Sequence, residues 1–168
     1  MMRLLLGVIC ILGSCLFNVV ANSNQNTNKQ AQEPLQVVSA TARPSLEGSY
    51  NSAAYLTIHN NTDSDITLID AKAPSVANNV ELHTIATDNG VKKMVKVNNL
   101  VIPQKGDLVM QPGGIHIMLM NLKDKLNLGE RFNLTIKSKE YGYMKVSVCV
   151  TNIFNPGPDQ DPCSIQQK

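Results

Sequence analysis

The chain has 168 residues, with 15 basic and 13 acidic side chains and a formal net charge of +2. Aromatic residues make up 4% of the chain, and tryptophan is absent. This length predicts one domain with extensions, large enough to bury a core without metal or disulfide. The near-neutral charge and the scarcity of aromatic side chains argue against nucleic-acid binding, which needs basic patches and stacking platforms.

The N-terminal segment has the pattern of an export signal. Arg3 precedes an apolar run over residues 4–12, and small residues typical of a cleavage site follow. We therefore expect a signal peptide over residues 1–21. Two alternatives stay open, an uncleaved membrane anchor and lipidation at Cys15, which ends a Leu-Gly-Ser-Cys sequence similar to a bacterial lipobox.

Composition divides the rest of the chain into three parts. Residues 22–34 are rich in Asn and Gln and predict a flexible polar linker, because they cannot bury enough apolar surface to become ordered. Residues 35–151 form the expected globular domain. Residues 152–168 contain an Asn-Pro-Gly-Pro sequence and predict a C-terminal tail.

The pattern of the expected domain is mostly that of short strands. Apolar and polar residues alternate over short segments, and Gly, Pro and Asn occupy the gaps. This is typical of an antiparallel β-sandwich or barrel. The predicted strands cover residues 35–40, 53–58, 66–71, 80–87, 91–97, 108–110, 115–120, 132–137 and 144–151.

Two histidines and two methionines form the pattern H-x10-M-x21-H-x-M, at His83, Met94, His116 and Met118. The chain has only three His and seven Met. Imidazole nitrogen and thioether sulfur together make a soft donor set, which favours copper(I) over hard ions such as calcium or magnesium. Each residue alone would more often be a solvated or packing side chain, so the hypothesis depends on the set.

Turn chemistry predicts how the first two of these side chains meet. Asn89-Gly90 is typical of a two-residue hairpin turn, because that turn needs positive φ at both positions. Such a turn pairs Ile85 with Met94 and makes His83 a diagonal neighbour of Met94 on the same face. A three-residue loop would instead send His83 to the other face.

His116 and Met118 are two residues apart in a predicted strand, so their side chains share a face. Met120 shares that face too, and we assign it to the wall of the site, with ligation as the lesser alternative. A Pro-Gly-Gly turn at residues 112–114 precedes His116. We therefore expect His116 to lie near a sheet end and to be accessible.

The cysteines point to an oxidising compartment. Cys149 and Cys163 remain once the leader is removed, and an even pair in an exported chain can form a disulfide. Alternation over residues 145–150 places Cys149 on the face opposite the valines, from which an outward thiol could reach the tail. We predict a Cys149–Cys163 disulfide, with two free thiols as the alternative.

The chain resembles the periplasmic copper chaperones of the PCuAC type. The histidine and methionine pattern matches that family without a gap, and the segments 52–58, 80–83 and 112–120 are also similar. The resemblance covers residues 35–150. It implies a single-domain, cupredoxin-like antiparallel β-sandwich with a copper(I) site on its surface, held by the two histidines and two methionines of the pattern.

The resemblance also implies a function. It implies a periplasmic metallochaperone, not an enzyme, that delivers copper to the copper-binding subunit of cytochrome c oxidase or to another copper chaperone. We expect a monomer that contacts the membrane only through an uncleaved or lipidated N-terminus. No His or Met follows Met144, so the second copper site that some relatives carry in the tail is not expected here.

Two other functions are compatible with the same pattern. A redox copper protein would cycle between copper(I) and copper(II), but blue-copper sites need a Cys thiolate and neither Cys149 nor Cys163 fits the pattern. A β-sandwich that binds other proteins without any metal is the second alternative. Nucleophilic catalysis has no support, because the chain lacks a G-x-S-x-G motif.

Overall fold

The computed structural model describes residues 32–153, in which every regular element is a β-strand. The strands are β1 (Leu35–Ala42), β2 (Ser52–Asn60), β3 (Ile66–Lys72), β4 (Ala77–Asp88), β5 (Val91–Lys96), β6 (Leu100–Ile102), β7 (Asp107–Val109), β8 (His116–Leu122), β9 (Arg131–Ser138) and β10 (Gly142–Val150). Within these residues no helix is long and apolar enough to cross a membrane. The predicted all-β class is confirmed.

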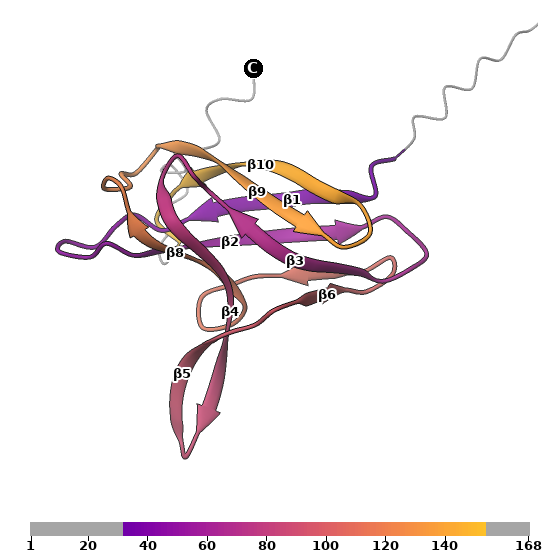
Figure 1. Ribbon diagram of the computed structural model, residues 1–168, viewed down its shortest axis with the longest axis horizontal. Coiled ribbons are helices and arrows are strands. Elements are labelled where there is room, and N and C mark those ends of the chain that lie inside the picture. The colour runs from indigo at the N-terminus through magenta and orange to yellow at the C-terminus, as the bar shows by residue number, and fades with distance from the viewer. Residues whose placement is uncertain (1–31, 154–168) are drawn as a thin grey trace, which may run out of the picture. The chain divides into compact units, whose positions relative to one another are not determined.

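The strands form one connected sheet in the order β5-β4-β8-β2-β1-β10-β9-β3-β6, with β7 paired to β2 (Figure 1). All pairs are antiparallel except β1 with β10. Irregular registers occur in β1 between Val37 and Ser39 and in β3 between Leu68 and Asp70, and such bulges bend a sheet. β6 ends the order yet packs against β2 and β7, so the sheet closes around a core.

Alternate residues of the strands fill this core. Leu56 and Ile58 of β2 are fully buried, and β9 and β10 contribute residues in the same alternating way. On β8 the buried core residues include Ile117 and Leu119, and on β4 they include Leu82. Because strand side chains alternate between faces, the histidines and methionines of β4 and β8 lie on the face away from the core.

β4 changes its partner halfway along its length. Its residues from Ala77 to His83 pair with β8, and those from His83 to Asp88 pair with β5. Beyond His83 the β4–β5 hairpin is therefore a two-stranded ribbon, which Figure 1 shows leaving the rest of the sheet. Every residue of β5 is exposed. His83 thus lies at the point where the ribbon begins.

The strand β6 was not predicted. It spans Leu100–Ile102, and Pro103 follows it directly. Its three residues pair with Ile66, Thr67 and Leu68 of β3. The other predicted strands exist, with ends that differ by a few residues.

The end of the predicted linker is attached to the domain. Gln32 Nε2 donates to Asn61 Oδ1 at 2.9 Å, and Asn61 Nδ2 donates to the Glu33 carbonyl at 2.8 Å. Asn61 N also donates to the Pro34 carbonyl at 2.9 Å. The flexible linker predicted over residues 22–34 stays a prediction. The predicted signal peptide and the tail from residue 154 onward lie outside the described residues.

Cys149 is buried, with 1% of its surface exposed, so the expectation of an outward thiol is wrong. The physical reason is that both faces of β10 are covered at this end, where Val148, Cys149 and Val150 are all buried. Cys149 is disulfide-bonded. Cys163 lies outside the described residues, so the pairing of these two cysteines stays a prediction.

Candidate metal site

The turn between β4 and β5 has the predicted geometry. Asn89 has φ 49° and Gly90 has φ 80°, so both turn positions are left-handed, as a tight primed hairpin turn requires. Ile85 consequently pairs with Met94. The predicted register is confirmed, and it places His83 and Met94 on the same face of the hairpin.

The fold brings the two histidines together. His83 of β4 lies directly opposite His116 of β8, and their ring centroids are 5.7 Å apart at an interplanar angle of 62°. Met118 lies opposite Glu81, two residues from His83, and so shares this face. Met94 and Met118 therefore flank the histidine pair from its two sides along β4.

Exposure differs strongly among these side chains. His116 is 4% exposed, the His83 side chain is 13% exposed and Met94 is 59% exposed. The expectation that His116 is accessible is wrong, although it does begin its strand. The Tyr55 ring of β2 lies 6.4 Å from the His116 ring, so His116 is enclosed between Tyr55 and His83. The buried His116 imidazole therefore lies at the bottom of the site, and the exposed Met94 thioether lies at its edge.

A carboxylate determines which nitrogen of His83 carries the proton. His83 Nε2 lies 2.9 Å from Glu81 Oε2, and Lys96 Nζ donates to Glu81 Oε1 at 2.8 Å. The hydrogen bonds from His83 and then from Lys96 hold the pKa of the Glu81 carboxyl below its ordinary value. An ionised carboxylate can only accept, so His83 Nε2 is the donor and His83 Nδ1 keeps a lone pair.

His83 Nδ1 has no hydrogen-bond partner, although it is buried. Among the side-chain nitrogens and oxygens of residues 32–153, it is the only buried atom without a hydrogen-bond partner. Leaving such an atom unsatisfied costs roughly 1–3 kcal/mol, so it calls for an explanation. A metal ion bound at His83 Nδ1 would satisfy the atom.

His116 is oriented by a backbone carbonyl instead. Its Nδ1 lies 2.9 Å from the carbonyl oxygen of Gly114. A carbonyl oxygen only accepts, so Nδ1 carries the proton and His116 Nε2 keeps a lone pair. Imidazoles that bind metals commonly donate their second ring N–H to a carboxylate or a backbone carbonyl, and both histidines here follow that pattern.

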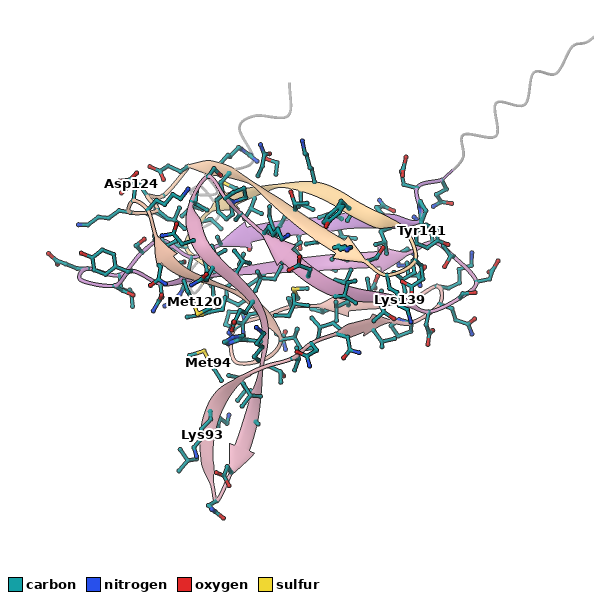
Figure 2. The ribbon with its side chains drawn as sticks, in the orientation of Figure 1. Lys93, Met94, Met120, Asp124, Lys139 and Tyr141 are labelled. Atoms are coloured by element: carbon teal, nitrogen blue, oxygen red, sulfur yellow. The ribbon has the colours of Figure 1, made fainter. Side chains whose placement is uncertain are left out.

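Met118 and Met120 are both half-buried on the outer face of β8. Met120 lies opposite Asn79 and is two residues farther from the histidines than Met118. Figure 2 shows the labelled Met94 and Met120 side chains on the same side of the β4 ribbon. This position agrees with the assignment of Met120 to the wall of the site. That assignment stays a prediction.

The remaining histidine lies elsewhere. His59 Nδ1 is 2.7 Å from Asp107 Oδ1, in a pair formed between β2 and β7. No cluster of three or more His, Cys, Asp or Glu that could hold a metal occurs in the described part of the chain.

The two groups that orient the histidines were not predicted from the sequence. Glu81 lies two residues before His83 on the same strand, so strand alternation alone could have revealed it. The Gly114 carbonyl left no signal in the sequence, because its direction depends on how the turn before β8 folds.

Comparison with known proteins places the chain in a family. Residues 35–150 match the family model described as "Putative lipoprotein LpqE-like". The chain belongs to the LpqE-like family. It is also 32% identical over 146 residues to the uncharacterized protein RP573 of Rickettsia prowazekii (strain Madrid E), a match that covers 84% of this chain and 80% of RP573.

Solved structures of similar proteins agree with the family. The solution structure of CuI-DR1885 from Deinococcus radiodurans is 32% identical, with a TM-score of 0.61, and the match covers 77% of this chain and 87% of that one. The copper-bound PCuAC domain from PmoF2 is 19% identical, with a TM-score of 0.59, over 70% of this chain and 92% of that domain, and it shows the fold. The resemblance to PCuAC-type proteins and the cupredoxin-like fold are confirmed.

Proposed function

We propose that this protein is a copper(I) metallochaperone that binds one copper through His83, Met94, His116 and Met118 and transfers it to an acceptor protein. The observation that carries the proposal is the buried, unpartnered Nδ1 of His83, 5.7 Å ring to ring from a second histidine and flanked by two thioethers. The 32% identity with CuI-DR1885, whose structure was solved with copper(I), supports the choice of metal.

The donor atoms follow from the hydrogen bonds. His83 would bind through Nδ1 and His116 through Nε2, because the other nitrogen of each ring is used by Glu81 or Gly114. The two thioethers complete a neutral, soft donor set that favours copper(I). Thioethers are weaker donors than thiolates, so transfer to a thiolate-rich acceptor is favourable.

Transfer also needs an accessible ligand. Met94 is 59% exposed while His116 is 4% exposed, so an incoming ligand would reach copper from the Met94 side. Met94 would leave first, while the buried imidazoles hold the ion until the acceptor's own ligands have bound. This order of exchange keeps copper from being released into solvent.

The proposal predicts that copper affinity depends on pH. A proton and copper(I) would compete for the same lone pairs on His83 Nδ1 and His116 Nε2, so acidification through the histidine range should weaken binding. A copper(I) affinity that stays constant from neutral pH to about pH 5 would contradict ligation by histidine.

We further propose that the protein acts in the bacterial periplasm and supplies the copper-binding subunit of cytochrome c oxidase or another copper chaperone. The resemblance to PCuAC-type proteins supports this acceptor class. The lipoprotein description of the family and the disulfide-bonded Cys149 support export, because disulfides persist in oxidising compartments.

A blue-copper electron-transfer site would need a Cys thiolate as a copper ligand. The described residues include one cysteine, Cys149, which is disulfide-bonded and lies on β10, a strand that does not pair with β4 or β8. Copper held by thioethers and imidazoles is expected to show no strong thiolate band in the visible spectrum. We propose no enzymatic activity.

The decisive experiment is a copper(I) competition titration against a chromophoric chelator. We expect one tight equivalent in the wild type and loss of that equivalent in a His116→Ala/Met118→Leu variant that remains folded by circular dichroism. His59→Ala/Met144→Leu, which removes one histidine and one methionine outside the site, is the matched control and should bind like the wild type. Equal binding by all three proteins would refute the ligand set.

A copper-dependent rise in melting temperature separates this function from a metal-free interaction domain. A ligand bound by the folded state must stabilise that state, by about 2.7 kcal/mol when it is present at one hundred times its dissociation constant. A melting temperature that does not respond to copper(I) would favour the interaction domain.

A further inference from the structure

The β4–β5 hairpin exposes apolar side chains that the core does not use. Val91, Met94 and Val95 are 57%, 59% and 36% exposed. β5 ends the strand order, and the part of β4 beyond His83 pairs only with β5, so both edges of this ribbon are open. Natural proteins avoid leaving open, apolar strand edges in water unless another molecule covers them or charges protect them.

The same hairpin carries a concentration of positive charge. β5 contains Lys92, Lys93 and Lys96, and the facing half of β4 contributes only one acidic residue, Asp88. Lys92 and Lys96 stand two residues on either side of Met94, so they share its face of the ribbon. Along this face of β5, Met94 therefore lies between two lysines.

These lysines remain available to a partner. Lys93 Nζ pairs with Asp88 at 2.9 Å and Lys96 Nζ pairs with Glu81 at 2.8 Å, while no ion pair involves Lys92 within residues 32–153. The two lysine side chains that are paired are still more than half exposed. Exposed ion pairs of this kind contribute little, so a stronger set of carboxylates on a partner can replace them.

We infer that the Met94 face of the β4–β5 hairpin docks an acidic protein surface that surrounds the acceptor's copper-binding ligands. The inference rests on the proposed function and adds the chemistry of the partner. An acceptor must bring its ligands to the exposed Met94, and carboxylates around those ligands would meet Lys92 and Lys96 on the same face. Charge complementarity of this kind accelerates association and selects the partner.

The test uses two synthetic peptides as copper acceptors. Both contain the same pair of cysteines, flanked by glutamates in the acidic peptide and by lysines in the basic one. Copper(I)-loaded protein is mixed with each reduced peptide without oxygen, and the ultraviolet absorption of copper(I)–thiolate bonds reports the transfer rate. Donor and acceptor exchange the same copper(I) ion, so no redox step is involved.

The variant is Lys92→Glu, and Lys96 is kept because it bonds Glu81. The control is Lys139→Glu, an exposed lysine between β9 and β10. Figure 2 shows the labelled Lys139 well away from Lys93. At low salt we expect the hairpin variant to deliver copper to the acidic peptide about threefold more slowly than the control, and to the basic peptide faster. Both differences should disappear near 1 M salt, where the Debye length is about 3 Å.

Equal rates for the hairpin variant and the control with both peptides would overturn the docking surface. Copper(I) affinity, measured by competition on the same samples, should be unchanged in both variants. If binding is intact and the rates are equal, the docking inference alone fails. If the wild type does not hold copper(I), the proposed function fails and the inference fails with it.

Discussion

His83 and His116 face each other across the β4–β8 pair, and their rings meet edge to face with centroids 5.7 Å apart. Each ring is held from its far side by a different acceptor, the Glu81 carboxylate or the Gly114 carbonyl. His83 Nδ1 and His116 Nε2 are therefore the ring nitrogens without such an acceptor. Their lone pairs can bind an ion, whereas they add little to the stability of the metal-free protein.

Replacing His83 with leucine should separate stability from function. The substitution removes the buried, unpartnered Nδ1 but also the bond from Nε2 to Glu81, and the two effects oppose each other, so we expect the metal-free free energy of unfolding to change by less than about 1 kcal/mol. Tight copper(I) binding should be lost. Urea unfolding in the presence of a copper chelator measures the first effect. His59→Leu is the control, and it should lower stability slightly because it breaks a bond to Asp107. A loss of more than about 1 kcal/mol on His83→Leu would mean that His83 stabilises the fold.

The tautomers of the two histidines should differ in the metal-free protein. Long-range nitrogen–proton NMR correlations should show His83 protonated at Nε2 and His116 protonated at Nδ1, as their acceptors require. Glu81→Ala should remove this preference at His83 alone and weaken copper(I) binding about 10- to 100-fold, the usual effect of losing a partner of a metal-bound histidine. Asp70→Ala, which removes another partly exposed acid, should change neither observation. The same tautomer at both rings would contradict the proposed donor atoms.

Exchanging Met94 and Val95 should destroy the site without changing the composition of the chain. Met94 lies opposite Ile85 and Val95 lies opposite Thr84, so the two side chains point to opposite faces of the hairpin. In the Met94→Val/Val95→Met variant the thioether moves to the wrong face. We expect its copper(I) affinity to fall as far as that of Met94→Leu, measured by chelator competition. An affinity clearly above that of Met94→Leu would show that the face of the thioether is unimportant.

Acid should destabilise the fold partly through Glu140. The Thr67 N–H donates to Glu140 Oε2 at 2.9 Å, and this bond holds the pKa of the Glu140 carboxyl below its ordinary value of 4.5. The folded state therefore binds this proton less readily than the unfolded state. The stabilisation is present above the ordinary pKa and is lost as the pH falls through the lowered one.

The Glu140→Gln variant tests this effect. Its free energy of unfolding should fall less between pH 6 and pH 3 than that of the wild type, when both are followed by urea unfolding. Glu47→Gln, at an exposed position between β1 and β2, serves as the control and should retain the dependence of the wild type. Identical pH profiles for wild type and Glu140→Gln would contradict the role of the Thr67 bond.

Much of the fold was predictable because it depends on local pattern. Alternation identified strands such as β2 and β9, in which buried residues alternate with more exposed ones along much of the strand. The strand β6 was not predicted, although the equally short β7 was. The burial of Cys149 escaped prediction because alternation of burial ends in this part of β10, where Val148, Cys149 and Val150 are all buried.

By itself, the sequence determined the composition of the candidate site and the hairpin that carries part of it. Asn89-Gly90 specified the turn, and alternation specified the faces of His83, Met94, His116 and Met118, because backbone φ and side-chain direction are properties of neighbouring residues. Only the tertiary structure decided that β8 lies beside β4. It also decided which imidazole nitrogens remain free and how deeply each ring is buried. These features arise from contacts between segments far apart in the chain, and no local pattern records such contacts.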